Sequence, residues 1–169
     1  MKNHFELFGL APAFALDPTH LERAYREIQS RVHPDRFAHA ADAERRASMQ
    51  MTTQVNEAYR TLRSPLQRAK YSLELNGVDV AFETDTAMPK EFLIEQMALR
   101  EQLEQARSVD ALRLLQENLS VQKKNLQDKL AEQIDIRKNF AGASGLVRKL
   151  MFLERVGEEI DSAYEALEA

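Results

Sequence analysis

The sequence predicts an all-α protein in which a domain built on a helical hairpin precedes an antiparallel three-helix bundle. Apolar residues make up 44% of the 169 positions, and only five glycines and five prolines interrupt them. No long alternating run of β-branched residues is present, whereas apolar residues recur every three or four positions, as in amphipathic helices. A chain of this length is expected to form one or two small domains.

The composition excludes several kinds of site. The chain has no cysteine, which excludes disulfides, thiol catalysis and cysteine-ligated zinc or iron–sulfur centres. It has no run of eighteen apolar residues, so no membrane span is expected. Residues 1–75 hold 11 basic and 9 acidic side chains, and residues 76–169 hold 12 and 18. Neither half is basic enough to indicate nucleic acid as the main partner.

The N-terminus allows two interpretations. Residues 5–16 are apolar enough to imitate a secretory signal, but Glu6 lies inside the stretch and Pro12 breaks it. We therefore expect a cytoplasmic protein whose first short helix packs Phe5 and Phe8 into a core.

Asp17-Pro18 is a strong signal for the start of the next helix, with a capping residue followed by proline at the first helical position. Four apolar residues follow at helical intervals and form one stripe: Leu21, Tyr25, Ile28 and Val32. The opposite side carries three arginines, Arg23, Arg26 and Arg31. Glutamates are interspersed among them, so a solvated face with ion pairs between successive turns is the alternative to a binding face.

The tripeptide His33-Pro34-Asp35 ends this helix. Proline lacks a backbone donor and disfavours helical geometry in the residue before it, so the helix must stop near Val32. His33 and Asp35 are therefore expected to project from an exposed turn, where they can contact a partner. An acid–base pair lacks a third orienting group, a metal site with His39 lacks a recognisable spacing, and a DNA-binding helix-turn-helix needs a more basic domain.

Two further helices complete the first half. Asp42 is expected to cap a long helix whose core face is Met51, Val55, Ala58 and Leu62. This helix has room to run antiparallel to the preceding one, with the His-Pro-Asp turn at the tip of the hairpin. Ser64-Pro65 starts a fourth helix, and Asn76-Gly77 ends it.

Residues 76–88 are predicted to be a connector, and a helix begins near Pro89. Its core stripe is Phe92, Leu99, Leu103 and Ala106. Three other apolar residues, Leu93, Ile94 and Met97, lie on a different face of this helix, which indicates a docking patch unless another element covers them. Phe152 of the last helix is also about 100° from the centre of its own stripe and could join them.

Two more striped helices follow. Ser108 can cap the first, whose apolar positions are Leu112, Leu115, Leu119, Leu126, Leu130 and Ile134. Gly142 and Gly145 are expected to break the chain. The last helix then carries Leu146, Leu150, Leu153, Gly157, Ile160, Tyr164 and Leu167. Short connections favour an antiparallel three-helix bundle, and a dimeric coiled coil is the alternative.

Residues 1–75 resemble a J-domain, the module that activates DnaK-class chaperone ATPases. The residues that carry the resemblance are Phe5, Leu7, Tyr25, Arg26, His33-Pro34-Asp35, Asn56-Glu57-Ala58-Tyr59, Leu62, Pro65, Arg68-Ala69 and Tyr71. The resemblance implies a protein that is not itself an enzyme and that docks on the chaperone through its loop and basic helix. The implied contact residues are His33, Pro34, Asp35, Arg36, Arg23, Arg26 and Arg31. Glu27 departs from the pattern, because many J-domains carry a base there.

The whole chain resembles the HscB type of iron–sulfur cluster co-chaperone. The strings that carry this resemblance are Phe5-Glu6-Leu7-Phe8-Gly9-Leu10, Asp35-Arg36-Phe37, Phe92-Leu93-Ile94-Glu95-Gln96-Met97, Leu99-Arg100-Glu101, Arg148-Lys149-Leu150 and Phe152-Leu153. The resemblance implies that residues 89–169 bind an IscU-type cluster scaffold protein, which is delivered to an HscA-type chaperone. The implied scaffold contacts are Leu93, Ile94, Met97, Glu101 and Phe152.

The same resemblance sets the remaining expectations. It implies no cofactor and no metal, and the missing zinc-binding cysteine extension of some eukaryotic members suits a bacterial protein. Ala98 replaces a residue that is commonly acidic in the family. A general protein-folding J-protein, or a coiled-coil adaptor with a J-domain, is the alternative function. The absence of a Gly/Phe-rich linker and of a cysteine-rich domain counts against the general type.

Overall fold

The computed structural model describes residues 2–80 and 89–169, and within these two ranges every regular element is a helix. The predicted all-α class is confirmed. The chain divides into two compact units, Met1–Ser72 and Leu73–Ala169. Most of the predicted connector, residues 81–88, lies outside the described residues. Among the described helices, none is long and apolar enough to cross a membrane.

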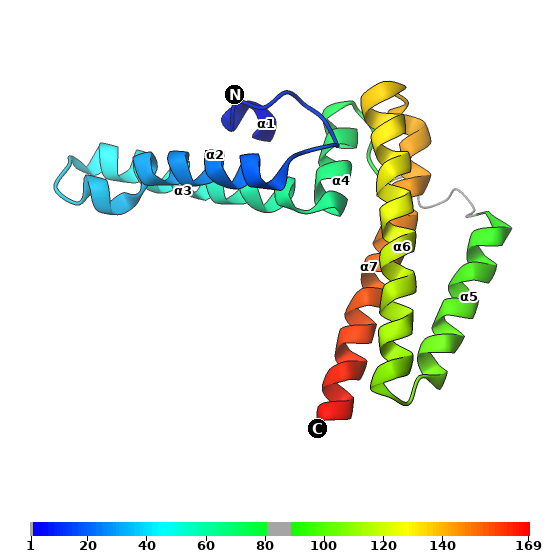
Figure 1. The fold of residues 1–169 in the computed structure, drawn as a ribbon. Coiled ribbons are helices and arrows are strands. Elements are labelled where there is room, and N and C mark those ends of the chain that lie inside the picture. The colour runs from blue at the N-terminus through cyan, green and yellow to red at the C-terminus, as the bar shows by residue number, and fades with distance from the viewer. Residues whose placement is uncertain (1, 81–88) are drawn as a thin grey trace. The chain divides into compact units, whose positions relative to one another are not determined.

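The first unit is built on a hairpin of two long helices. Its elements are α1 (His4–Leu7), α2 (Pro18–Val32), the short 3-10 helix η1 (Pro34–Phe37), α3 (Asp42–Arg63) and the greater part of α4 (Pro65–Leu75). Helices α2 and α3 run antiparallel, and the turn between them forms the tip of the hairpin (Figure 1). The loop that contains η1 is therefore at the end of a rigid pair of helices.

Local signals explain where these helices begin and end. The Asp17 carboxylate accepts a hydrogen bond from the Thr19 N–H at 3.0 Å, and Pro18 occupies the first turn of α2. Gly77, at φ +79°, ends α4 in the left-handed region that favours glycine. One predicted cap is wrong: α3 is preceded by Ala41 without a side-chain cap, and Asp42 lies inside the first turn.

The core of the first unit lies where α1 meets the hairpin. Phe5 and Phe8 are buried, as predicted, together with Leu21, Val55, Ala58 and Leu62. The expected stripe of α2 packs against this core. Met51, in the middle of α3, is exposed instead, so its assignment to the core face was wrong.

The second unit is an antiparallel bundle of three helices, as predicted. Its elements are α5 (Lys90–Gln105), α6 (Val109–Ala131), a π-helical turn η3 (Glu132–Ile136) and α7 (Phe140–Glu168). All six predicted apolar positions of α6 and η3 are buried. Figure 1 shows α6 and α7 side by side along their length, with α5 beside them.

Two expectations for the last helix were wrong. Gly142 and Gly145 do not break the chain, because α7 begins at Phe140 and includes both. Asn139 caps the helix by accepting a hydrogen bond from the Gly142 N–H at 3.0 Å, and a Cβ at Gly142 would collide with the Asn139 amide. Glycine therefore makes room for the cap. At the other end, Leu167 is exposed and is not part of the core.

Candidate functional site

The His-Pro-Asp loop presents its carboxylate to solvent. The side chain of Asp35 is 92% exposed, and that of His33 is about half exposed. The backbone N–H of Asp35 donates to His33 Nδ1 at 3.2 Å, and the Arg36 N–H donates to the His33 carbonyl at 3.0 Å. The Asp35 carboxylate also lies 3.6 Å from His33 Nδ1, and its exposed side can accept a hydrogen bond from an external cation.

The arginines that the sequence indicated lie on α2 and in the loop itself. Arg36 follows Asp35 within η1, and the others lie on α2; all four are exposed: Arg23, Arg26, Arg31 and Arg36. Arg26 also pairs with Glu22 at 2.7 Å, one helical turn away. Such exposed pairs contribute little stability, so the cationic face stays available to an anionic partner surface.

Sequence reasoning missed how the loop is held at its start. The carbonyl of Val32, the last residue of α2, accepts a hydrogen bond from Ser48 Oγ of α3 at 2.6 Å. Thr52 Oγ1 lies 3.2 Å from the same carbonyl oxygen. The detectable signal was a serine that occupies a position on the buried stripe of α3.

The second candidate site is the docking patch on α5, defined as Leu93, Ile94 and Met97. Their exposed fractions are 45%, 57% and 72%, so the other described helices of the second unit do not cover them. The exposed carboxylate of Glu101 lies further along the same helix, as expected, and accepts from Gln105 Nε2 at 3.4 Å. An apolar patch with an acidic edge has the composition that is typical of protein-binding surfaces.

Phe152 is not an exposed member of this patch. Only 9% of it is exposed, and its ring packs edge-on against Phe92 with centroids 5.7 Å apart. The guanidinium of Arg100 lies 5.5 Å from the centroid of Phe152, and Lys149 Nζ lies 5.4 Å from that of Phe92. Phe152 therefore connects α7 to α5 through buried contacts. The expectation that it would be exposed was wrong.

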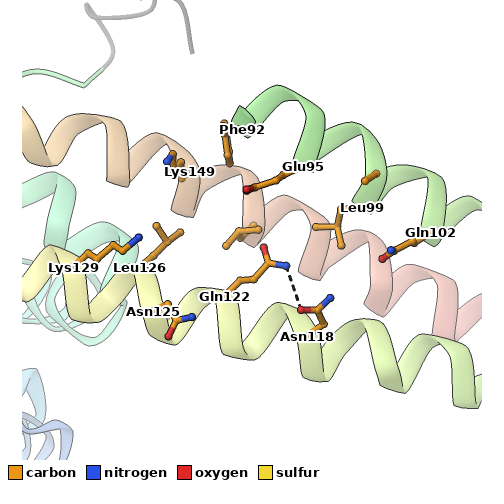
Figure 2. Close-up of a pocket in the computed structure, with 12 residues that line it drawn as sticks. Phe92, Glu95, Leu99, Gln102, Asn118, Gln122, Asn125, Leu126, Lys129 and Lys149 are labelled. Atoms are coloured by element: carbon orange, nitrogen blue, oxygen red, sulfur yellow. Dashed lines mark hydrogen bonds between the residues drawn. The ribbon is translucent and has the colours of Figure 1, made fainter. Parts of the chain in front are cut away.

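The face of α5 opposite the docking patch borders a groove of about 460 Å³ between α5, α6 and α7 (Figure 2). Phe92 and Leu99 of α5 face Leu126 and Leu153 across it, and the amides of Asn118 and Gln122 line its α6 side. This groove shows that α5 contacts the bundle through a few large apolar side chains. The docking patch is carried on the outer face of that helix.

The titratable side chains of the described residues do not form a metal-binding cluster. Across residues 2–80 and 89–169, no three histidine, aspartate or glutamate side chains gather in a way that could hold a metal ion. Burial lowers the pKa of His4, which stacks on Tyr71 with ring centroids 4.3 Å apart, and nearby Glu57 partly offsets that shift. His4 lies on α1, away from the loop and its arginines in the sequence.

Comparison with known proteins shows the family. Residues 3–72 match the DnaJ domain, and residues 88–161 match the HSCB C-terminal oligomerisation domain. The co-chaperone protein HscB homolog of Aromatoleum aromaticum is 49% identical over 99% of this chain and 96% of its own.

Two solved structures share the fold. Chaperone HscB from Vibrio cholerae has a TM-score of 0.86 and 34% identity, over 98% of this chain and 99% of its own. Human co-chaperone protein HscB has a TM-score of 0.92 and 29% identity, over 97% of this chain and 83% of its own. With an exposed His-Pro-Asp loop in a DnaJ domain and relatives of this similarity along its whole length, the chain belongs to the HscB co-chaperone family.

Proposed function

We propose that this protein binds an IscU-type iron–sulfur scaffold protein, delivers it to an HscA-type DnaK-class chaperone and stimulates that chaperone's ATPase. The proposed division is a J-domain in residues 1–75, a connector in residues 76–88 and a scaffold-binding domain in residues 89–169. The observation that carries the proposal is the presence of two exposed surfaces of different chemistry, one within residues 1–75 and one within residues 89–169. The proposed setting is the bacterial cytoplasm, because two of the relatives described above come from the bacteria Aromatoleum aromaticum and Vibrio cholerae.

The loop supplies the stimulating contact in this proposal. Asp35 projects a carboxylate that is 92% exposed and lies 3.6 Å from His33 Nδ1, and exposed arginines follow it in η1 and precede it on α2. A carboxylate can form a charge-assisted bond to one basic group of the chaperone, while the arginines approach acidic groups nearby. Binding one conformation of the ATPase more tightly than the other shifts its population, which requires no catalytic group in this chain.

The docking patch supplies the second contact. Leu93, Ile94 and Met97 expose flexible and branched apolar side chains on one helix, and Glu101 adds a charge at its edge. Burying such side chains against a complementary surface gives the binding energy, whereas the charge of Glu101 favours one orientation of the partner. The scaffold is proposed as the partner on the basis of family membership.

Asp35→Asn tests the first contact. The variant keeps the size of an exposed side chain, so the fold and scaffold binding are expected to be unchanged while ATPase stimulation is lost. Asp161→Asn removes the same charge from the exposed surface of α7 and is the matched control. Normal stimulation by Asp35→Asn in a steady-state ATPase titration would show that the loop is not the activating contact.

The link between the two contacts needs a separate test. The full chain and residues 1–76 are each titrated into the chaperone, with and without scaffold. Because a bound scaffold is held near the chaperone, its encounter with the chaperone becomes effectively intramolecular. Scaffold is therefore expected to increase stimulation by the full chain and to leave stimulation by the fragment unchanged. Equal synergy in both would exclude delivery by tethering.

A further inference from the structure

We propose that Ser48, supported by Thr52, is a positioning residue for the His-Pro-Asp loop, because it anchors the last carbonyl of α2. This inference rests on the proposed function for its biological meaning. The contact itself belongs to the first unit alone. Ser48 Oγ donates to the Val32 carbonyl at 2.6 Å, and this bond joins residues 16 positions apart in the sequence.

The Val32 carbonyl cannot find a partner within its own segment. The last carbonyls of a helix normally accept from amides that follow them or from caps. Here Pro34 has no N–H. The N–H of Asp35 is bonded to His33 Nδ1, and the N–H of Arg36 is bonded to the His33 carbonyl. A partner must therefore come from another element, and α3 supplies it.

Serine is an unfavourable residue at this buried helical position, so its hydroxyl must form a compensating interaction. The other buried residues of α3 are apolar: Val55, Ala58 and Leu62. Ser48 is only 5% exposed, and alanine would be the better helix former at a buried site of this size. A buried hydroxyl is tolerated when it makes a hydrogen bond, and the bond that Ser48 makes is the one to Val32.

Thr52 plays a weaker part. Its hydroxyl carries one proton and lies 2.8 Å from the Ser48 carbonyl and 3.2 Å from the Val32 carbonyl. The shorter contact is the ordinary back-bond of a helical threonine, so Thr52 shares its proton between two acceptors. Removing Ser48 therefore leaves the Val32 carbonyl with a partial substitute.

Fixing the Val32 carbonyl also affects the position of Asp35. The Val32 carbonyl belongs to the peptide plane from which His33 leaves the helix, so holding that oxygen fixes the direction in which the loop departs. A loop held in one direction loses less conformational freedom when the chaperone binds it. Ser48 thus increases the affinity of the loop for the chaperone without contacting the chaperone.

Four variants of the full chain test this inference. Ser48→Ala removes the main donor, Thr52→Val removes the shared donor, and Thr52→Ser retains it. Thr53→Val is the matched control, because Thr53 makes the same back-bond at 3.0 Å, to Met49, on the exposed side of α3. Each variant is measured for the chaperone concentration response of ATPase stimulation, for the order parameters of the Asp35 and Arg36 amides, and for melting.

We expect Ser48→Ala to raise the half-maximal concentration by up to about fivefold, the limit set by the net free energy of one hydrogen bond, with an unchanged plateau. The order parameters of both loop amides should fall. Thr52→Val should have about a twofold effect, and Thr52→Ser and Thr53→Val should match the wild type. A Ser48→Ala variant that melts earlier but keeps both the half-maximal concentration and the loop order would overturn the inference.

Failure of the proposed function is distinguishable from failure of this inference. If the wild-type protein does not stimulate the chaperone, the proposed function is wrong. The order parameters of the Asp35 and Arg36 amides then test the positioning role by themselves. Lower order parameters in Ser48→Ala would then support it, and unchanged ones would overturn it. If Ser48→Ala does not fold, the comparison of Thr52→Val with Thr52→Ser decides in the same way.

Discussion

The docking patch and Phe152 are expected to respond to alanine in opposite ways. Truncating a buried phenylalanine costs about 3–5 kcal/mol of unfolding free energy, and Phe152 is 9% exposed and packed on Phe92. In a chain of this size that loss lowers the melting temperature by roughly 6–20 °C. Leu93→Ala, Ile94→Ala and Met97→Ala remove side chains that are half exposed or more. Together they should cost only about 1.5 kcal/mol, partly offset by the helix propensity of alanine.

Binding should show the reverse order. Exposed apolar residues at the centre of an interface often contribute more than about 1 kcal/mol each, so the triple variant should lose about 100-fold in scaffold affinity. Under conditions in which the Phe152→Ala variant is folded, it should lose much less scaffold affinity than the triple variant. Urea unfolding followed by circular dichroism and calorimetric titration with the scaffold give the two quantities.

A matched control is available on α6. Leu114 and Val121 are 65% and 60% exposed, and alanine at both removes exposed apolar surface outside the patch. This control should leave stability and affinity close to the wild type. The reasoning is refuted if the triple variant unfolds the bundle, or if Phe152→Ala abolishes binding while the unfolding free energy is unchanged.

Further variants test other contacts. Arg68→Leu should lower the unfolding free energy by about 3 kcal/mol in urea titrations, because Arg68 donates at 2.6 Å to two backbone carbonyls of the first unit. Gly77→Ala should cost about 1 kcal/mol in the same assay, since the residue has φ +79°. The folded-state pKa of His4 is lowered from 6.5, so the unfolded chain binds more protons as the pH falls through that value. Stability should therefore fall on acidification below pH 6.5, and His4→Phe should flatten that part of a urea-midpoint series. Glu27→Lys should lower the half-maximal concentration for ATPase stimulation, and added salt should reduce the gain.

Helix boundaries in the first half were predictable because their causes are local. A capping aspartate before Pro18, a proline at position 34 and a serine before Pro65 each act on neighbouring backbone groups. The wheel of α5 also separated its buried face from the docking patch. Phe92 and Leu99 are buried while Leu93, Ile94 and Met97 are exposed. This follows because a helix with a regular period of about 3.6 residues turns only one face toward the bundle.

Contact between elements explains one wrong expectation, and a local helix cap explains another. Phe152 lies off the stripe of α7, but a wheel cannot show that Phe92 and Arg100 of α5 come to cover it. Glycine usually indicates the end of a helix, yet Gly142 serves the cap made by Asn139. The partner of Ser48 is likewise a backbone carbonyl of α2, which side-chain periodicity does not represent.

The modest anchoring of α5 has a consequence for hydrogen–deuterium exchange. Helix α5 buries two side chains, Phe92 and Leu99, whereas α7 buries eight. Segments with little buried apolar surface open at a lower free energy than the whole domain, so their amides exchange earlier. The amides of α5 should thus exchange well before those of α7 in the free chain. A partner that binds the outer face of α5 should suppress this local unfolding. Its binding should therefore slow amide exchange mainly in α5.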